Sequence, residues 1–140
     1  MIKTLRLLLQ CLLLPLYFFI FSDFFFFCQA DVGTAKQYSP PYLPTECFAN
    51  DASQFPPNNF FAAAGDGVWD NGASCGRQYL VRCVSATAPS ICDTSTTIQV
   101  KIVDIAPSTF SGTTIVLSET AFGAIAGSAT GVLNVEFQQV

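Results

Sequence analysis

Hydrophobic and polar residues alternate in several short segments, which is the pattern of half-buried β-strands. In TTIQVKIVDI (96–105) Ile98, Val100 and Ile102 fall on one face, and simple alternation extends that face to Asp104. In GVLNVEFQQV (131–140) Leu133, Val135, Phe137 and Gln139 share one face. Less regular alternation predicts further strands in VGTAKQY (32–38), YLVRCVS (79–85) and GTTIVLS (112–118), and FFAAA (60–64) predicts a strand or a short helical turn.

The remaining segments carry helix and turn signals. Ser118 precedes ETAFGAIAG (119–127), where a capping hydroxyl, core-spaced apolar residues and a final glycine predict two helical turns. Asp70-Asn71-Gly72 is a turn signal, and prolines break the two segments around 40–44 and 56–57 into loops. About six short strands with one short helix predict a small β-barrel or sandwich.

The first thirty residues are expected to be a signal peptide. Lys3 and Arg6 precede a long apolar run, and small residues occupy the end of the segment at Cys28 and Ala30. A membrane anchor is the alternative, because the run approaches the length of a spanning helix, but Ser22 and Asp23 interrupt it. We therefore expect residues 1–30 to be a signal peptide and 31–140 to be one secreted domain with no membrane span.

Charge and cysteine content narrow the possible partners and cofactors. Residues 31–140 hold four Lys or Arg against nine Asp or Glu, a net charge of −5, which argues against nucleic acid and anionic membranes. The chain has no histidine, so a catalytic triad or a zinc site is not expected, and neither is a cofactor. The four cysteines of 31–140 are expected to form two disulfides, and spacing alone allows three pairings.

Several motifs together resemble one family. GTAKQYSPPYLPTECF, FAAAGDGVWDNGASCGRQYLVRC, IQVKIVDIA, GTTIVLSETAFGAIA and NVEFQQV are similar to plant natriuretic peptide-like proteins. These are single-domain relatives of the expansin N-terminal domain and of family-45 endoglucanases. The resemblance covers nearly all of 31–140. It implies an all-β fold, a six-stranded double-psi β-barrel with one or two short helices, and the pairs Cys47–Cys75 and Cys83–Cys92.

The sequence departs from these relatives where their chemistry lies. The expansin and endoglucanase string His-Phe-Asp-Leu-Ser aligns with TIVLS, which places Val116 at the position of the acid. Asp104 is then an acid without its partner, whereas inverting glycoside hydrolysis needs two carboxyl groups. The CGRQY stretch also lacks one family cysteine. We therefore expect no enzyme activity, with a glycosidase as the least favoured alternative.

A remnant groove is the candidate site, made of Tyr38, Tyr42, Trp69, Asp70 and Asp104. Trp69 is interpreted either as a core residue or as a sugar-stacking face, and Asp104 either as a hydrogen-bond acceptor at a strand end or as a ligand contact. Arg77 and Arg82 are expected to pair with Asp66, Asp70 or Glu46, or else to face an acidic partner.

Two functions remain after these exclusions. The resemblance implies a monomeric protein of the apoplast and cell wall that acts on a plasma-membrane receptor in water and solute homeostasis and in stress or pathogen response. In that family the active region maps to about Phe48–Arg77 of this chain. The alternative is a cell-wall polysaccharide binder without hydrolase activity, which uses the remnant groove.

Overall fold

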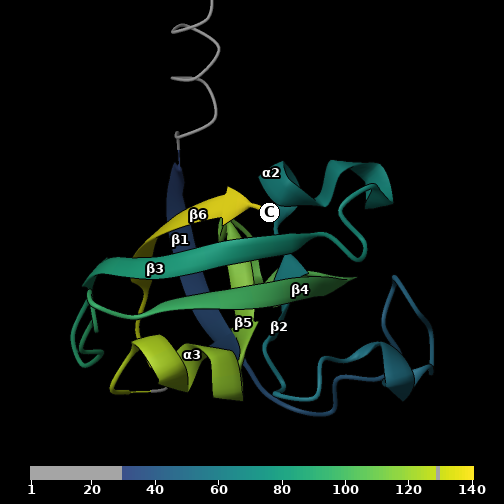
Figure 1. Ribbon diagram of the computed structural model, residues 1–140, viewed down its shortest axis with the longest axis horizontal. Helices are drawn as coiled ribbons and strands as arrows, with labels where there is room; N and C mark the ends of the chain where they lie inside the picture. Colours follow the sequence, from purple (N-terminus) through teal and green to yellow (C-terminus); the bar gives the residue numbers. More distant parts are fainter. Residues whose placement is uncertain (1–29, 129) are drawn as a thin grey trace, which may run out of the picture. The chain divides into compact units, whose positions relative to one another are not determined.

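Six strands close on themselves in a computed structural model that describes residues 30–128 and 130–140. Around the barrel the order is β1-β5-β2-β4-β3-β6 (Figure 1). The strands are β1 (Asp31–Tyr38), β2 (Phe61–Ala64), β3 (Gln78–Ala86), β4 (Thr97–Ile105), β5 (Ile115–Ser118) and β6 (Leu133–Gln139). The pairs β1–β5 and β2–β4 are parallel and the other four are antiparallel. The predicted strands are all present.

The barrel interior is filled by one face of each strand. On β4, Ile98, Val100 and Ile102 point inward, and on β6 Leu133 and Val135 do so, as the alternation predicts. All five are at most 5% exposed. Burying one such side chain contributes about 1.5–3 kcal/mol, so this cluster is the main apolar contribution to folding.

A β-bulge makes the alternation prediction wrong for Asp104. The register runs from Ala62 opposite Ile102 to Ala63 opposite Asp104, which leaves Val103 as an extra residue on β4. A bulge sets two residues against one and breaks the period of two. Val103 packs in a second apolar cluster outside the barrel interior, and Asp104 lies on that outer side instead of continuing the inner face.

Two short helices lie at opposite sides of the barrel in the view of Figure 1. Helix α3 (Glu119–Ile125) is the predicted one, and the Ser118 hydroxyl accepts a hydrogen bond from the Ala121 amide at 3.2 Å. Helix α2 (Asp66–Trp69) is a single turn that the sequence analysis did not predict, and it continues into η2 (Asp70–Gly72).

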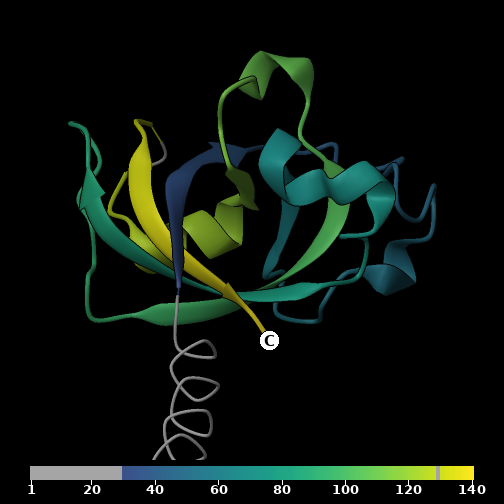
Figure 2. The ribbon, with the colours of Figure 1, turned by 90° about the horizontal axis from the view of Figure 1, so that it is seen from above.

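Close backbone packing sets the position of α2. A Cβ atom on Gly65 would lie 1.9 Å from the Thr113 carbonyl oxygen, so only glycine fits between β2 and α2. The helix then ends in two successive non-glycine residues with positive φ, Asp70 (52°) and Asn71 (50°). In Figure 2, the segment with η3 (Ser108–Phe110) projects beyond the strands.

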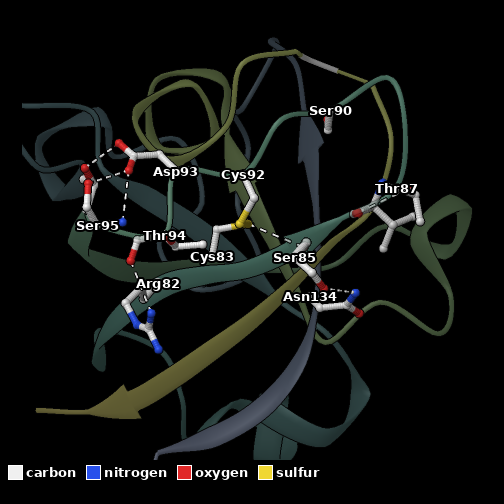
Figure 3. Close-up of a disulfide and its surroundings, with 12 residues drawn as sticks. Arg82, Cys83, Ser85, Thr87, Ser90, Cys92, Asp93, Thr94, Ser95 and Asn134 are labelled. Carbon is white, nitrogen blue, oxygen red and sulfur yellow. Dashed lines mark hydrogen bonds between the residues drawn. A yellow bond between two sulfur atoms is a disulfide. The ribbon is translucent and has the colours of Figure 1, made fainter.

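The disulfides are Cys47–Cys75 and Cys83–Cys92, the two pairs that the family resemblance implies. Cys83 is on β3, and its bridge ties the loop after β3 to the barrel (Figure 3). In that loop, Asp93 accepts hydrogen bonds from the Ser95 amide and hydroxyl at 3.0 and 2.7 Å. The loop is therefore ordered by local hydrogen bonds as well as by the bridge.

The arginines pair differently from the expectation in one case. Arg77 binds Asp70 at 3.1 Å, which is one of the expected partners. Arg82 instead binds Glu136 at 2.6 Å, because the two residues are directly opposite on β3 and β6. Both pairs are partly exposed, so each adds little to the stability of the fold.

Candidate functional site

A row of three residues crosses the outer side of β4, β2 and β5. Ala63 on β2 is in register with Asp104 on β4 and with Val116 on β5. Directly opposed residues point to the same side of a sheet, so Asp104 and Val116 flank Ala63 on one face. Val116 is fully buried, in the second apolar cluster together with Ala63.

Aromatic rings cover this row. Tyr38, at the end of β1, lies with its ring centroid 4.9 Å from that of Tyr42 in an edge-to-face arrangement. Tyr42 contacts Phe61 in the same way at 4.7 Å. Tyr38 and Phe61 are 8% and 3% exposed, whereas Tyr42 is half-buried. Tyr42 is therefore the ring of this group that a ligand can reach.

The hydroxyls of the two tyrosines have different surroundings. The Tyr42 hydroxyl donates to the Tyr38 carbonyl at 3.1 Å and accepts from the Glu119 amide at 3.2 Å. The Tyr38 hydroxyl is buried and has no hydrogen-bond partner among the described residues. Burial, and next the nearby Asp104 carboxylate, raise the pKa of Tyr38 far above its ordinary value, so it stays neutral.

Asp104 is held by backbone donors. Its Oδ1 accepts from the Glu46 amide and from the Ile105 amide, both at 2.8 Å. Partial burial raises the pKa of Asp104, although the two amide hydrogen bonds act in the opposite direction. These contacts give Asp104 the acceptor role at a strand end. No described residue donates to its Oδ2 in the hydrogen bonds of this site, so that oxygen can accept from a ligand.

The loop that brings Glu46 to Asp104 is fastened to the barrel at two more points. The Lys101 ammonium lies 5.0 Å from the centroid of the Phe48 ring and donates to the Gln54 carbonyl at 2.9 Å. The Cys47–Cys75 bridge ties the same loop to the segment before β3. Phe48 and Lys101 are thus part of the site's support, and the sequence analysis missed both because their contact joins segments far apart in the chain.

Trp69 and Asp70 belong to a different surface. They line a depression of about 860 Å³ together with residues of β1, β3 and β6, and neither Tyr38, Tyr42 nor Asp104 lines it. Trp69 is half-buried and packs against the barrel interior, so it serves both as a core residue and as a wall of that depression. The five residues of the predicted groove therefore divide into two groups. The first group is Tyr38, Tyr42 and Asp104, and the second is Trp69 and Asp70.

The chemistry open to the first group follows from its single carboxylate. General acid and general base catalysis of glycoside hydrolysis needs a second carboxyl group across the sugar. Val116 stands at the position that the register sets against Asp104. The group can accept a hydrogen bond at Asp104 and offer the half-buried Tyr42 ring. Among residues 30–128 and 130–140, no three His, Cys, Asp or Glu side chains are arranged to hold a metal ion.

The fold is a closed six-stranded double-psi β-barrel, and the site places Asp104 and two tyrosines on one outer side of it. A family model described as lytic transglycolase, of the double-psi β-barrel type, matches residues 61–137, which are 77 of the 140. An EG45-like domain containing protein of Citrus jambhiri is 38% identical over 79% of this chain and 82% of its own. A putative EG45-like domain containing protein 1 of Arabidopsis thaliana is 40% identical over 85% and 88%. The chain belongs to this family of EG45-like domain-containing proteins.

Solved structures show the same fold at low sequence identity. An expansin of Clavibacter michiganensis has a TM-score of 0.59 at 20% identity, with 80% of this chain and 50% of that one covered. A point mutant of that expansin, solved in complex with cellohexaose, has a TM-score of 0.60. A Streptomyces papain inhibitor has a TM-score of 0.53 at 22% identity, with 96% of its chain covered. The chain therefore spans half of the length of the expansin.

Two expectations concern the membrane and the N-terminus. Within the described part of the chain, no helix is long and apolar enough to cross a bilayer. The predicted signal peptide lies, except for Ala30, outside the described residues, so it stays a prediction.

Proposed function

We propose that this is a secreted, non-hydrolytic protein of the apoplast that acts on a plasma-membrane receptor in water and solute homeostasis and in stress or pathogen response. The observation that carries the non-hydrolytic part is the fully buried Val116 in register with Asp104 across Ala63. The signalling part is supported by the resemblance to plant natriuretic peptide-like proteins.

The mapped active region is well suited to recognition. Cys47 and Cys75 are covalently joined, and Lys101 holds the loop at Gln54. Residues 49–53 and 57–59 between these anchors are exposed. A rigid barrel with fastened, exposed loops is a common arrangement for binding a partner.

Two assays on one preparation test this function. The purified secreted protein is expected to change the volume of plant protoplasts and to release no reducing sugar from cellulose or pectin. The matched variant Asp104→Asn keeps an acceptor oxygen for the Glu46 and Ile105 amides and removes the ionisable group. Sugar release that disappears in Asp104→Asn would overturn the non-hydrolytic proposal, and unchanged protoplast volume would overturn the signalling proposal.

Polysaccharide binding at the groove is the second candidate. It is supported by the half-buried Tyr42 ring and Asp104, which lie on the same outer side of the barrel, and by a fold shared with an expansin that was solved with cellohexaose. Retention on cellulose should then weaken in Tyr42→Ala and remain in Trp69→Ala, because Trp69 lies in the other group. Equal retention of the two variants would contradict this candidate.

A further inference from the structure

The depression around Trp69 combines an acidic rim with an apolar wall. Its rim carries Asp31, Asp66 and Asp70 against one cation, Arg77, a net charge of −2. Arg77 is paired with Asp70 at 3.1 Å, whereas Asp31 and Asp66 form no ion pair among the described residues. The predicted cleavage after Ala30 would add an α-ammonium group at Asp31. Asp66 is then the rim acid that has neither an ion pair nor a new positive charge on the same residue.

The apolar part of the depression is exposed where a partner can reach it. Val32 on β1 is 77% exposed, the largest exposure among the large hydrophobic residues of 30–128 and 130–140. The half-buried Trp69 and the nearly buried Phe137 line the same depression. An exposed aliphatic side chain and a tryptophan that line one depression offer contacts for an apolar side chain, and the tryptophan ring also attracts a cation.

The backbone turns sharply directly after Trp69. Asp70 and Asn71 both have positive φ, which non-glycine residues seldom adopt. Asp and Asn adopt this region more readily than most other non-glycine residues, which makes Asp-Asn-Gly a turn sequence. Here they turn the chain directly after Trp69 and place Asp70 opposite Arg77.

We propose that this depression binds a segment of a partner protein in which a Lys or Arg side chain lies next to an aliphatic one. The cation meets Asp66 and the aliphatic side chain packs against Val32 and Trp69. A neutral or acidic wall glycan would gain nothing from the net negative charge, which is why a basic peptide is favoured over a polysaccharide. The role of the depression as the surface that faces the receptor depends on the proposed signalling function.

The chain contains one tryptophan, so its emission reports on this depression directly. The probe is a blocked six-residue peptide of alternating leucine and lysine, and the controls are the same peptide with glutamate in place of lysine and cellohexaose. We expect a saturable emission change with the basic peptide only, weakened by added salt. An equal change with the acidic peptide or with cellohexaose would overturn the proposal.

Two exposed positions give variants that leave the fold intact. Asp66→Asn should weaken binding of the basic peptide about two- to five-fold, the effect of one exposed charge. Val32→Lys removes the apolar contact and adds repulsion, so it should weaken binding more. Glu119→Gln is the matched control, because it removes the same charge at α3, on the opposite side of the barrel. Equal weakening in Asp66→Asn and Glu119→Gln would show that only net charge matters and would overturn the site.

The protoplast assay separates this inference from the function on which it depends. The double variant Val32→Lys/Asp66→Asn should lose the volume response together with peptide binding. A retained response despite lost binding would overturn the depression as the receptor-facing surface. Site-specific peptide binding by a protein that leaves protoplast volume unchanged would support the depression as a peptide site and overturn the signalling function.

Discussion

Asp104 on β4 and Val116 on β5 are both in register with Ala63, so their side chains occupy one face two strand spacings apart. Two spacings correspond to about 10 Å between Cα atoms. Carboxyl groups of inverting glycosidases lie about 6.5–9.5 Å apart. The register therefore sets the two positions at about the spacing of such an acid pair, and a valine occupies one of them.

Val116→Asp tests whether this buried position tolerates a carboxyl group. Val116 is fully buried between apolar neighbours, so the carboxyl group would lack a partner. We expect the free energy of unfolding to fall by about 3 kcal/mol. Burial raises the pKa of such an acid above its unfolded value, so the loss should be smallest below about pH 4 and grow as the pH rises. Denaturant unfolding at several pH values measures it.

A matched variant keeps this test specific. Val116→Ala removes apolar contacts but adds no titratable group. Its loss of unfolding free energy relative to the wild type should therefore stay constant between about pH 3 and 7, where carboxyl groups titrate. A Val116→Asp protein as stable as the wild type at neutral pH would contradict the buried, unpartnered position.

Asp104 should make its own contribution to pH-dependent stability. Partial burial raises its pKa in the folded protein, so the folded state holds the proton more tightly than the unfolded chain does. Stability from this group is therefore present below the unfolded pKa of about 4 and is lost as the pH rises through the folded value. Relative to Asp104→Asn, the wild type should lose stability with rising pH, by less than about 1 kcal/mol because the group is partly solvated.

The measurement is the difference in unfolding free energy between wild type and Asp104→Asn, from about pH 3 to 7, on both sides of the unfolded pKa. A wild type that gains stability over the variant as the pH rises would show that the two amide hydrogen bonds outweigh burial.

The two disulfides should contribute unequally. Cys47–Cys75 closes a separation of 28 residues and Cys83–Cys92 one of 9. Loop-closure entropy gives about 3.6 kcal/mol for the longer loop and about 2.6 kcal/mol for the shorter one. Replacing each pair by alanine and measuring denaturant unfolding tests the order. A larger loss for the shorter loop would mean that packing around Cys83, and not chain entropy, dominates.

Ser118 joins a helix start to a distant loop. Its hydroxyl accepts from the Ala121 amide at 3.2 Å and donates to the Asn59 carbonyl at 2.7 Å, and the residue is 1% exposed. Ser118→Ala should lower the unfolding free energy by about 1–2 kcal/mol, because the helix loses its N-cap and the Asn59 carbonyl loses a donor. Ser111→Ala, at an exposed serine, is the control and should change it by less than about 0.5 kcal/mol. Equal effects of the two would contradict the capping role.

The local pattern of the sequence determined most of the fold. Alternation in 98–102 and 133–137 indicated which side chains point inward, because a strand has a period of two. Ser118 and the apolar spacing after it located α3 for the same local reason. The resemblance of TIVLS to the family motif also placed Val116 at the position of the acid, and this assignment stays a prediction.

Tertiary structure alone decided where the candidate site residues meet. The bulge at Val103 moved Asp104 to the outer face, since an extra residue depends on the partner strand and leaves no mark in the local pattern. Trp69 and Asp70 were separated from Tyr38 and gathered with Val32 because strand order around a closed barrel sets neighbours far apart in the chain. The sequence by itself determined the strands and the inward-facing side chains where alternation is regular, because that period is local; only the closed barrel decided which site residues share a surface.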